Sequence, residues 1–330
     1  MPNHFVDGSG FGSAKDAGLS PKQKMHRDWS GAIAALCIGL LGLALGRLGW
    51  LRLQLDVFSA LSVQAAILVI TSGIGLLMPR YKTLSATILF FSAIVAYGLW
   101  PSLPVSADGP APVGTKRLRI STFNIDNSDG REDAIVASLI SLDADVALLQ
   151  EYDGSPKLLA ALAIAYPYLV ACEDLSRCDV LIAARVPFKQ KVNLLLPNGP
   201  SAIGMRFGAE YSDLLVVDVH GSRFPKSVKQ FAETSVLARR LAQETGPMII
   251  AGDFNATAQS RLVQDFSKSL DLQPMLTLPT YPTAYGLPQI AIDQILVRNG
   301  IVSIGPQLGG DAVGSDHIPV ARSFAIPVQP

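Results

Sequence analysis

The stretch MIIAGDFNA, Met248 to Ala256, carries the features from which the fold of this chain can be predicted. Its first four residues are apolar, so a strand formed by them would present apolar side chains on both faces. The stretch LLVV at 214–217 has the same property. Strands of this kind are typical of sheets that are covered on both sides, and the sequence therefore predicts a layered α/β sandwich.

Other runs extend this pattern along the chain. Irregular alternation of strand-like and helical patterns predicts strands at 118–126, 145–151, 180–184, 214–220, 248–253 and 290–297, and helices at 131–142 and 226–243. Residues 101–115, rich in Pro, Gly and Ser, are predicted to be a linker, followed by one domain over 116–330.

Polar residues stand where these apolar strands should end, which is where ligand sites on α/β sheets commonly form. Taken singly, the FNIDN and GDFN stretches could be turns, and the carboxylate after ADVALLQ a solvated loop residue. The histidine of VVDVHG could likewise be a satisfied residue at a sheet edge. The candidates are Asn124, Asp126, Glu151, His220, Asp253, Asn255, Asp293, Asp316 and His317.

Asp293, in IAIDQILV, is the most informative of them because a turn does not explain it. It is expected in the middle of a strand, where an unpaired carboxylate would be costly to bury. His317, in GSDHIP, would need a carboxylate to fix its tautomer. The simplest prediction pairs Asp293 with His317 and leaves Asp316 free to bind a metal.

These groups are suited to metal-assisted hydrolysis of a phosphate ester. Carboxylate and amide oxygens such as those of Glu151, Asp126, Asp316 and Asn124 are hard ligands for Mg²⁺ or Mn²⁺. Zinc is not expected, because the domain has only two histidines and two cysteines, without CxxC or HExxH spacing. An oriented His317 would activate the attacking water or stabilise charge on the phosphoryl group.

The ordered set FNIDN, LLQE, GDFN, IDQIL and GSDHIP resembles the endonuclease/exonuclease/phosphatase superfamily of DNase I-like proteins over about residues 116–328. The resemblance implies a four-layered αββα sandwich with a divalent-metal phosphodiesterase or phosphatase site. It implies metal ligands at Glu151, Asn124 and Asp316, with Asp126 nearby. The catalytic residues that it implies are His317, Asp293, His220, Asp253 and Asn255.

Three uncharged runs precede this domain, Trp29–Gly46, Val57–Met78 and Thr83–Trp100. Each has roughly the 17–25 residues that a membrane-spanning helix needs. The three tryptophans lie at or beside the edges of the runs, as expected at a bilayer interface. Three buried helices of a soluble core are the alternative, but such helices normally carry a polar stripe. The sequence therefore predicts a three-helix anchor over 29–100.

Basic residues in the short loops predict the orientation of this anchor. The tail over 1–28 and the loop with Arg80 and Lys82 carry most of them, so both are expected in the cytoplasm. Three spans then place the domain outside, which predicts a multi-pass inner-membrane protein with a periplasmic catalytic domain. Release after Val105–Ala107, a small-residue stretch that resembles a cleavage site, is the alternative.

Substrate and redox state are left open. The chain after Pro101 has 19 Lys and Arg against 23 Asp and Glu, which disfavours a basic nucleic-acid surface without excluding a nuclease. A phosphodiester in nucleic acid or a phospholipid, a small phosphomonoester, and an inactive scaffold of the same fold are the alternatives. Cys172 and Cys178 could be two thiols or a local disulfide in an oxidising compartment.

Overall fold

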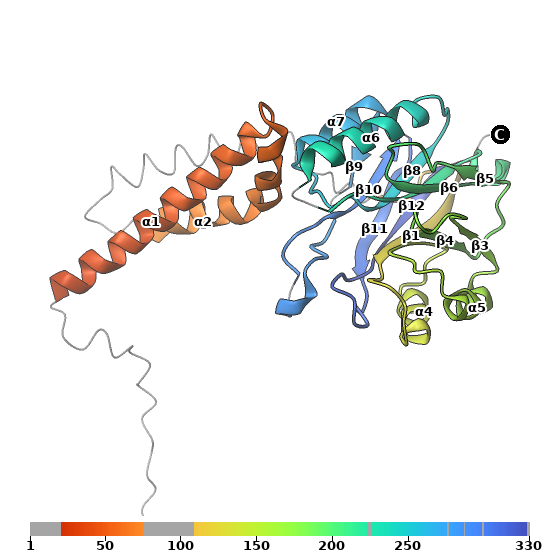
Figure 1. Cartoon of the computed structure of the whole chain (residues 1–330), viewed down its shortest axis with the longest axis horizontal. Coiled ribbons are helices and arrows are strands. Elements are labelled where there is room, and N and C mark those ends of the chain that lie inside the picture. The colour runs from red at the N-terminus through yellow and green to blue at the C-terminus, as the bar shows by residue number, and fades with distance from the viewer. Residues whose placement is uncertain are drawn as a thin grey trace, which may run out of the picture. The chain divides into compact units, whose positions relative to one another are not determined.

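Two mixed β-sheets form the C-terminal part of the chain (Figure 1). This computed structural model describes residues 21–75, 109–223, 226–275, 277–286, 288–298 and 300–328. The first six-stranded sheet has the order β11-β12-β1-β2-β4-β3, and the second β5-β6-β7-β8-β10-β9. The strands are β1 Thr115–Asn124, β2 Val146–Gln150, β3 Tyr168–Ala171, β4 Val180–Ala184, β5 Gln190–Asn193, β6 Ser201–Arg206, β7 Leu215–His220, β8 Met248–Asp253, β9 Leu272–Pro274, β10 Asp293–Arg298, β11 Val302–Gly309 and β12 Val320–Pro327.

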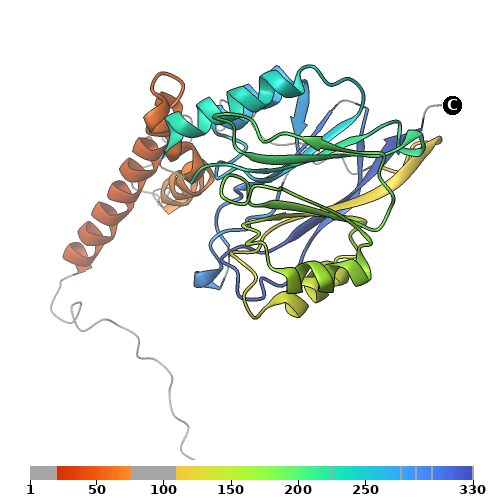
Figure 2. The same ribbon diagram turned by 45° about the vertical axis from the view of Figure 1, so that its right-hand side comes forward.

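Helices cover the outer face of each sheet. In Figure 2, α4 (Glu132–Ser141) and α5 (Pro156–Ala165) lie against the first sheet, and α6 (Ser227–Leu241) and α7 (Arg261–Ser269) against the second. Three buried apolar clusters fill the spaces between these layers: one between the two sheets, and one under each helical layer. Burial on both faces of β2, β4 and β8 is the expected consequence of their apolar sequences. The predicted α/β sandwich is confirmed. Two 3₁₀ helices, η5 (Ala209–Tyr211) and η6 (Thr283–Tyr285), lie in loops.

The strand pairing brings the polar strand ends to one edge. In the first sheet, β1 runs parallel to β2, with Asn124 opposite Gln150. In the second, β7 runs parallel to β8, with His220 opposite Asp253. The antiparallel strand β10 begins with Asp293, which is also opposite Asp253. The prediction that Asp293 lies in the middle of a strand is wrong: the strand starts there, because Ile290 pairs instead with Tyr281 in an isolated bridge.

The N-terminal part contains two apolar helices, α1 (Pro21–Leu48) and α2 (Ser62–Gly75), with the 3₁₀ segment η2 (Leu53–Leu61) between them. By length and composition, Ser30–Leu48 and Leu53–Ile74 could each cross a membrane. Large apolar side chains on both helices, such as Ile38 and Ile67, are exposed. The third predicted span, 83–100, lies outside the described residues.

Residues Leu43–Ser62 cluster with the sandwich, whereas the rest of α1 and α2 forms a separate unit. The carboxylate of Asp56 accepts hydrogen bonds from the backbone N–H groups of Arg261 (2.9 Å) and Leu262 (3.3 Å), in the first turn of α7. Arg261 also donates through its guanidinium to the carbonyl oxygen of Trp50. An acidic group is favourable at a helix N-terminus, where N–H groups lack partners within the helix. The loop between the two apolar helices is therefore bound to the sandwich by polar contacts.

Gly252 shapes the end of β8 just before Asp253. Its φ of +144° lies outside the range that other residues readily adopt, and a Cβ atom there would lie 1.9 Å from the carbonyl oxygen of Val219 on β7. Only glycine lets β7 and β8 approach this closely beside the site.

We expect Gly252→Ala to prevent folding or to lower the melting temperature of the purified full chain by well over 10 °C. Gly114→Ala is the matched control, because Gly114 has a φ of +78° but open space around its Cβ position. A residue of positive φ without a clash costs about 1–2 kcal/mol, or about 2–8 °C in a domain of this size. Equal shifts for the two variants would contradict this account of Gly252.

Candidate active site

His317 and Asp293 form a buried pair at the joint edge of the sheets. His317 Nδ1 lies 2.8 Å from Asp293 Oδ2, and both side chains are almost fully buried. The loop that carries His317 is held by Ser315, whose hydroxyl donates to the carbonyl oxygen of Asn124 and accepts from the His317 backbone N–H. The Tyr281 ring packs on the imidazole at a centroid distance of 5.0 Å. The predicted pairing of Asp293 with His317 is confirmed.

Asn124 and Asp253 join the two sheets. The side-chain amide of Asn124, at the end of β1, donates to Glu151 Oε1 (3.1 Å) and to Asp253 Oδ2 (3.0 Å). Asp253 in turn accepts from the backbone N–H of Asn255 (2.7 Å) and from its side-chain amide (3.2 Å). His317 Nε2 lies 3.8 Å from Asp253 Oδ2, so the His317–Asp293 pair and the Asn124–Asp253 hydrogen bond meet at one carboxylate.

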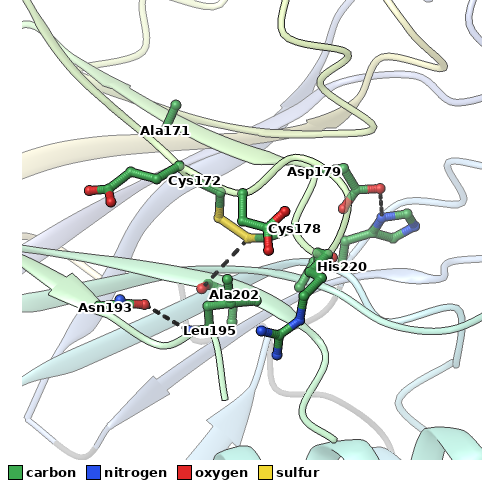
Figure 3. Close-up of a disulfide and its surroundings, with 12 residues drawn as sticks. Ala171, Cys172, Cys178, Asp179, Asn193, Leu195, Ala202 and His220 are labelled. Carbon is green, nitrogen blue, oxygen red and sulfur yellow. Dashed lines mark hydrogen bonds and ion pairs between the residues drawn. A yellow bond between two sulfur atoms is a disulfide. The ribbon is translucent and has the colours of Figure 1, made fainter. Parts of the chain in front are cut away.

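Glu151 and His220 complete the edge on the other side of Asn124. Arg223 donates to Glu151 Oε1 at 2.6 Å, and His220 Nε2 lies 3.9 Å from the same oxygen. His220 Nδ1 contacts Asp179 Oδ2 at 2.9 Å, which leaves Nε2 without a hydrogen-bond partner among the described residues. Figure 3 shows Asp179 and His220 beside the disulfide between Cys172 and Cys178. These two cysteines are therefore bonded, as one of the two predicted alternatives requires.

Backbone strain marks three of the candidate residues. Glu151 has a φ of +57°, Asn255 a φ of +49° and Asp126 a φ of +44°. The left-handed conformation costs roughly 1–2 kcal/mol for a residue such as Glu, and strain of this kind clusters at functional sites. The left-handed conformation of Glu151 turns its side chain toward Asn124 directly after β2 ends.

Charges in the site shift several pKa values strongly. Burial lowers the pKa of His317, but the charges of Asp293, Asp253 and Asp316 outweigh it and raise the value to about 9. Burial and the charge of Asp293 raise the pKa of Asp253 to about 6. For His220, burial is again outweighed, here by the hydrogen bond to Asp179 and by the charges of neighbouring carboxylates, and its pKa is about 9. Both imidazoles are therefore in the doubly protonated, cationic form at neutral pH and can stabilise an anionic phosphoryl group.

The donor set of the site fits a hard divalent cation, although the side chains do not form a closed ligand cage. Among the described residues, no group of three or more His, Cys, Asp and Glu side chains is arranged to hold a metal ion. Burial raises the pKa of Asp316, and the charges of Asp126 and Glu151 raise it further while His317 opposes them. Carboxylates that repel one another are stabilised by a bound cation. In this structure, the guanidinium of Arg223 supplies part of the positive charge that balances these carboxylates, through its ion pair with Glu151.

Three further residues belong to the site but were not predicted. Asp179 orients His220, and nothing in its local sequence indicates this role. Asp218, fully buried in β7, accepts a hydrogen bond from Gln150 (2.6 Å), and burial raises its pKa well above the usual value. The signal for Asp218 was available, since it is an acid in an apolar strand. Tyr281, which packs on His317, lies in a loop without periodicity.

Comparison with known proteins identifies the class to which this site belongs. A model of the endonuclease/exonuclease/phosphatase family matches residues 121–317, and the chain belongs to that family. Its members hydrolyse phosphate esters, typically with a divalent metal, and this chain is such an enzyme.

The individual proteins that this chain resembles share a low percentage of identical residues with it. UPF0294 protein plu0699 of Photorhabdus laumondii is 26% identical over 237 residues, which cover 68% of this chain and 88% of that protein. The endonuclease/exonuclease/phosphatase of Beutenbergia cavernae matches with a TM-score of 0.53 and 19% identity, over 64% of this chain and 72% of its own. Sphingomyelinase C of Streptomyces griseocarneus matches with a TM-score of 0.50 and 18% identity, over 63% and 99%. These structures share the fold of the sandwich.

We expect Asp293→Asn to lower kcat about 10²- to 10⁴-fold, because an amide cannot compensate the charge of the His317 imidazolium. The rate of hydrolysis of bis-p-nitrophenyl phosphate by the full chain, with Mg²⁺ or Mn²⁺ present, measures the effect. Asp271→Asn makes the same chemical change at an exposed residue and should leave kcat unchanged. An Asp293→Asn variant with full activity and an unaltered melting temperature would rule out the pair as a catalytic unit.

Proposed function

We propose that this protein is a membrane-anchored, divalent-metal-dependent phosphodiesterase that acts on the extracytoplasmic side. The observation that carries the proposal is the convergence of five polar side chains at one edge, joined by hydrogen bonds and by a 3.8 Å contact between His317 and Asp253: Asn124, Glu151, Asp253, Asp293 and His317. These residues come from five separate stretches of the chain, and a purely structural role would not require so many ionisable groups in one place.

The residues divide into a group that would hold the metal and a group that would act on the phosphate. Glu151, Asn124, Asp126 and Asp316 would bind Mg²⁺ or Mn²⁺. The cation would polarise a phosphoryl oxygen and stabilise charge on the leaving group. Occupation of this site requires Arg223 to release Glu151, and the exposed Arg223 side chain is free to turn toward a phosphate oxygen instead.

The remaining side chains would position and stabilise the reacting groups. Asp253 and Asn255 would hold the attacking water and a phosphate oxygen, while His220 would donate from Nε2 to a second phosphate oxygen. His317, oriented by Asp293, would stabilise the charge of the phosphoryl group. Water oxygen forms the new bond to phosphorus, the ester P–O bond breaks, and the water protons pass to the leaving group and to solvent. An inactive scaffold is not favoured, because every motif retains its acidic, amide or imidazole group.

Contacts of the loop between α1 and α2 support three membrane crossings. Trp50 and Asp56, in this loop, bind the first turn of α7. The loop and the sandwich must therefore lie on the same side of any bilayer that the two helices cross. A chain that leaves this side through α2 has to return before β1, and the apolar run 83–100 would be long enough for a third crossing. The cytoplasmic placement expected for Lys15, Lys22 and Lys24, together with Arg80 and Lys82, would fit this path.

Phosphodiester hydrolysis is tested with the purified full chain, first stripped of metal with a chelator. We expect no turnover of bis-p-nitrophenyl phosphate without metal and recovery on addition of Mg²⁺ or Mn²⁺, because the carboxylates of Glu151 and Asp316 need a cation to act on an anionic substrate. Glu151→Gln should weaken the apparent metal affinity, whereas the exposed Glu173→Gln should not. Full activity of the chelated enzyme would overturn the metal-dependent assignment. Turnover of p-nitrophenyl phosphate alone would favour the phosphomonoesterase alternative.

Membrane topology is tested separately by fusion of alkaline phosphatase after residue 328. The fusion should be active in a bacterial host, because this reporter requires export to fold. A fusion after Gly75 should be inactive, since α2 would have returned the chain to the cytoplasm. High activity at Gly75 together with none at residue 328 would reverse the proposed orientation.

A further inference from the structure

An apolar cavity of about 240 Å³ lies inside the unit that contains the sandwich, between η2 and the second sheet's helical layer. The surface that its walls present is mainly apolar, and the walls include Val57 and Leu61 from η2 and Leu262, Ile290 and Ile292 from the sandwich. Apolar cavities of roughly 150 Å³ already bind a molecule the size of benzene. Polar residues such as Gln230 and Thr257 also line the cavity but present little polar surface to it, so an apolar ligand is the favoured occupant.

The cavity shares its inner wall with the candidate active site. Asn255 lines the cavity and also donates to Asp253 at 3.2 Å. Tyr281 lines it from another side, and its ring packs on the His317 imidazole at a centroid distance of 5.0 Å. A ligand in the cavity would therefore lie directly beside the groups proposed to act on phosphorus.

A second cavity, of about 340 Å³, flanks the site at His220 and differs in chemistry. Arg177, Arg223 and Lys229 line it, together with Asp179 and Glu233. The centre is thus bordered by an aliphatic cavity near His317 and by a polar, charged cavity near His220. Such a division suits a phosphoester with one hydrocarbon substituent and one polar substituent.

We propose that the apolar cavity binds the hydrocarbon chain of a lipid phosphodiester, whose phosphate lies at the active site and whose polar headgroup lies toward His220. This proposal rests on the proposed function and specifies its substrate class. The outer wall argues for a lipid as the occupant, because η2 leads directly into α2, and both lie in the apolar stretch Leu53–Ile74 that could bring this wall to a bilayer surface. Leu61, which ends η2 and lines the cavity, exposes 47% of its surface. A hydrocarbon chain could therefore reach the cavity from a bilayer past Leu61, where η2 joins α2.

The test uses p-nitrophenyl phosphodiesters that carry a methyl, hexyl or decyl chain, below their micellar concentrations. The full chain is transferred into an amphipathic polymer free of small detergents, which would compete for the cavity. Products are followed by mass spectrometry, so that cleavage of either ester bond is counted. We expect kcat/KM to rise about 3- to 4-fold for each methylene that the cavity buries.

Ala60→Phe supplies the discriminating variant, because Ala60 lines the cavity from η2 and is not one of the proposed catalytic residues. The larger ring should remove the gain from chain length and leave hydrolysis of the methyl ester unchanged. Ala60→Ser, which hardly changes the volume, should keep the gain. Should Ala60→Phe fail to fold, Val57→Phe fills the same space from another position.

Each outcome separates this proposal from the proposed function. Equal kcat/KM for all three esters in the wild type would overturn the lipid-chain assignment while leaving a phosphodiesterase. Failure to hydrolyse any of them with Mg²⁺ or Mn²⁺ would overturn both. Photolabelling with a diazirine-bearing decyl phosphodiester gives a readout that is independent of turnover. Labels are expected on residues 57–61 or 290–292, and labelling confined to other parts of the chain would contradict the proposal.

Discussion

The hydrogen bond from Asn124 to Asp253 is the interaction on which the site depends. It joins the last residue of β1 in one sheet to the last residue of β8 in the other, at 3.0 Å and out of contact with solvent. A carboxylate so deeply buried is costly unless its oxygens accept hydrogen bonds. Asp253 meets this requirement with Asn124 and Asn255, and the same amide of Asn124 also fixes Glu151. The hydrogen bonds that this buried acid needs thus link the two sheets at this edge. Through Asn124, they also fix the position of Glu151.

Accumulated negative charge explains the remaining features of the edge. Asp253 and Asp293 are direct partners across β8 and β10, so their charges repel at short range. The proton held by His317 compensates both, and a cation beside Glu151 and Asp316 would compensate the outer acids. Binding of an anionic phosphate is favourable only in a site whose charge has been balanced in this way. Charge compensation by His317 therefore limits the cost of burying these acids and prepares the site for an anionic substrate by the same means.

The sequence predicted the elements whose own residues reveal their environment. Strands β4, β7 and β8 are apolar on both faces and were placed within one residue of their bounds. Other strands gave no such signal. β5 and β9 are short edge strands, β11 is interrupted by Gly305 and Pro306 with a shift of register, and β12 contains the buried Arg322. Their positions are set by pairing with partners distant in sequence. The strands that were not predicted are β3, β5, β6, β9, β11 and β12.

The candidate site shows the same division. Motif residues such as Asp293 and His317 could be predicted to pair because a buried acid and a buried base need each other. The partner of His220 could not, since Asp179 reaches it only through the folding of a loop closed by the disulfide. The contact of η2 with α7 was also beyond prediction, because an apolar run indicates burial in lipid or protein without saying which. It is this contact that associates the loop between the apolar helices with the catalytic sandwich.

Binding of one divalent cation where the two sheets meet is the decisive point of the proposed mechanism. Anomalous diffraction from crystals of the full chain grown with Mn²⁺ tests it, because manganese is located independently of any assumed mechanism. We expect a strong anomalous peak in direct contact with Glu151 and Asp316, with the guanidinium of Arg223 moved away from Glu151. A site that stays empty at saturating Mn²⁺, or a peak bound elsewhere while Arg223 remains on Glu151, would contradict it.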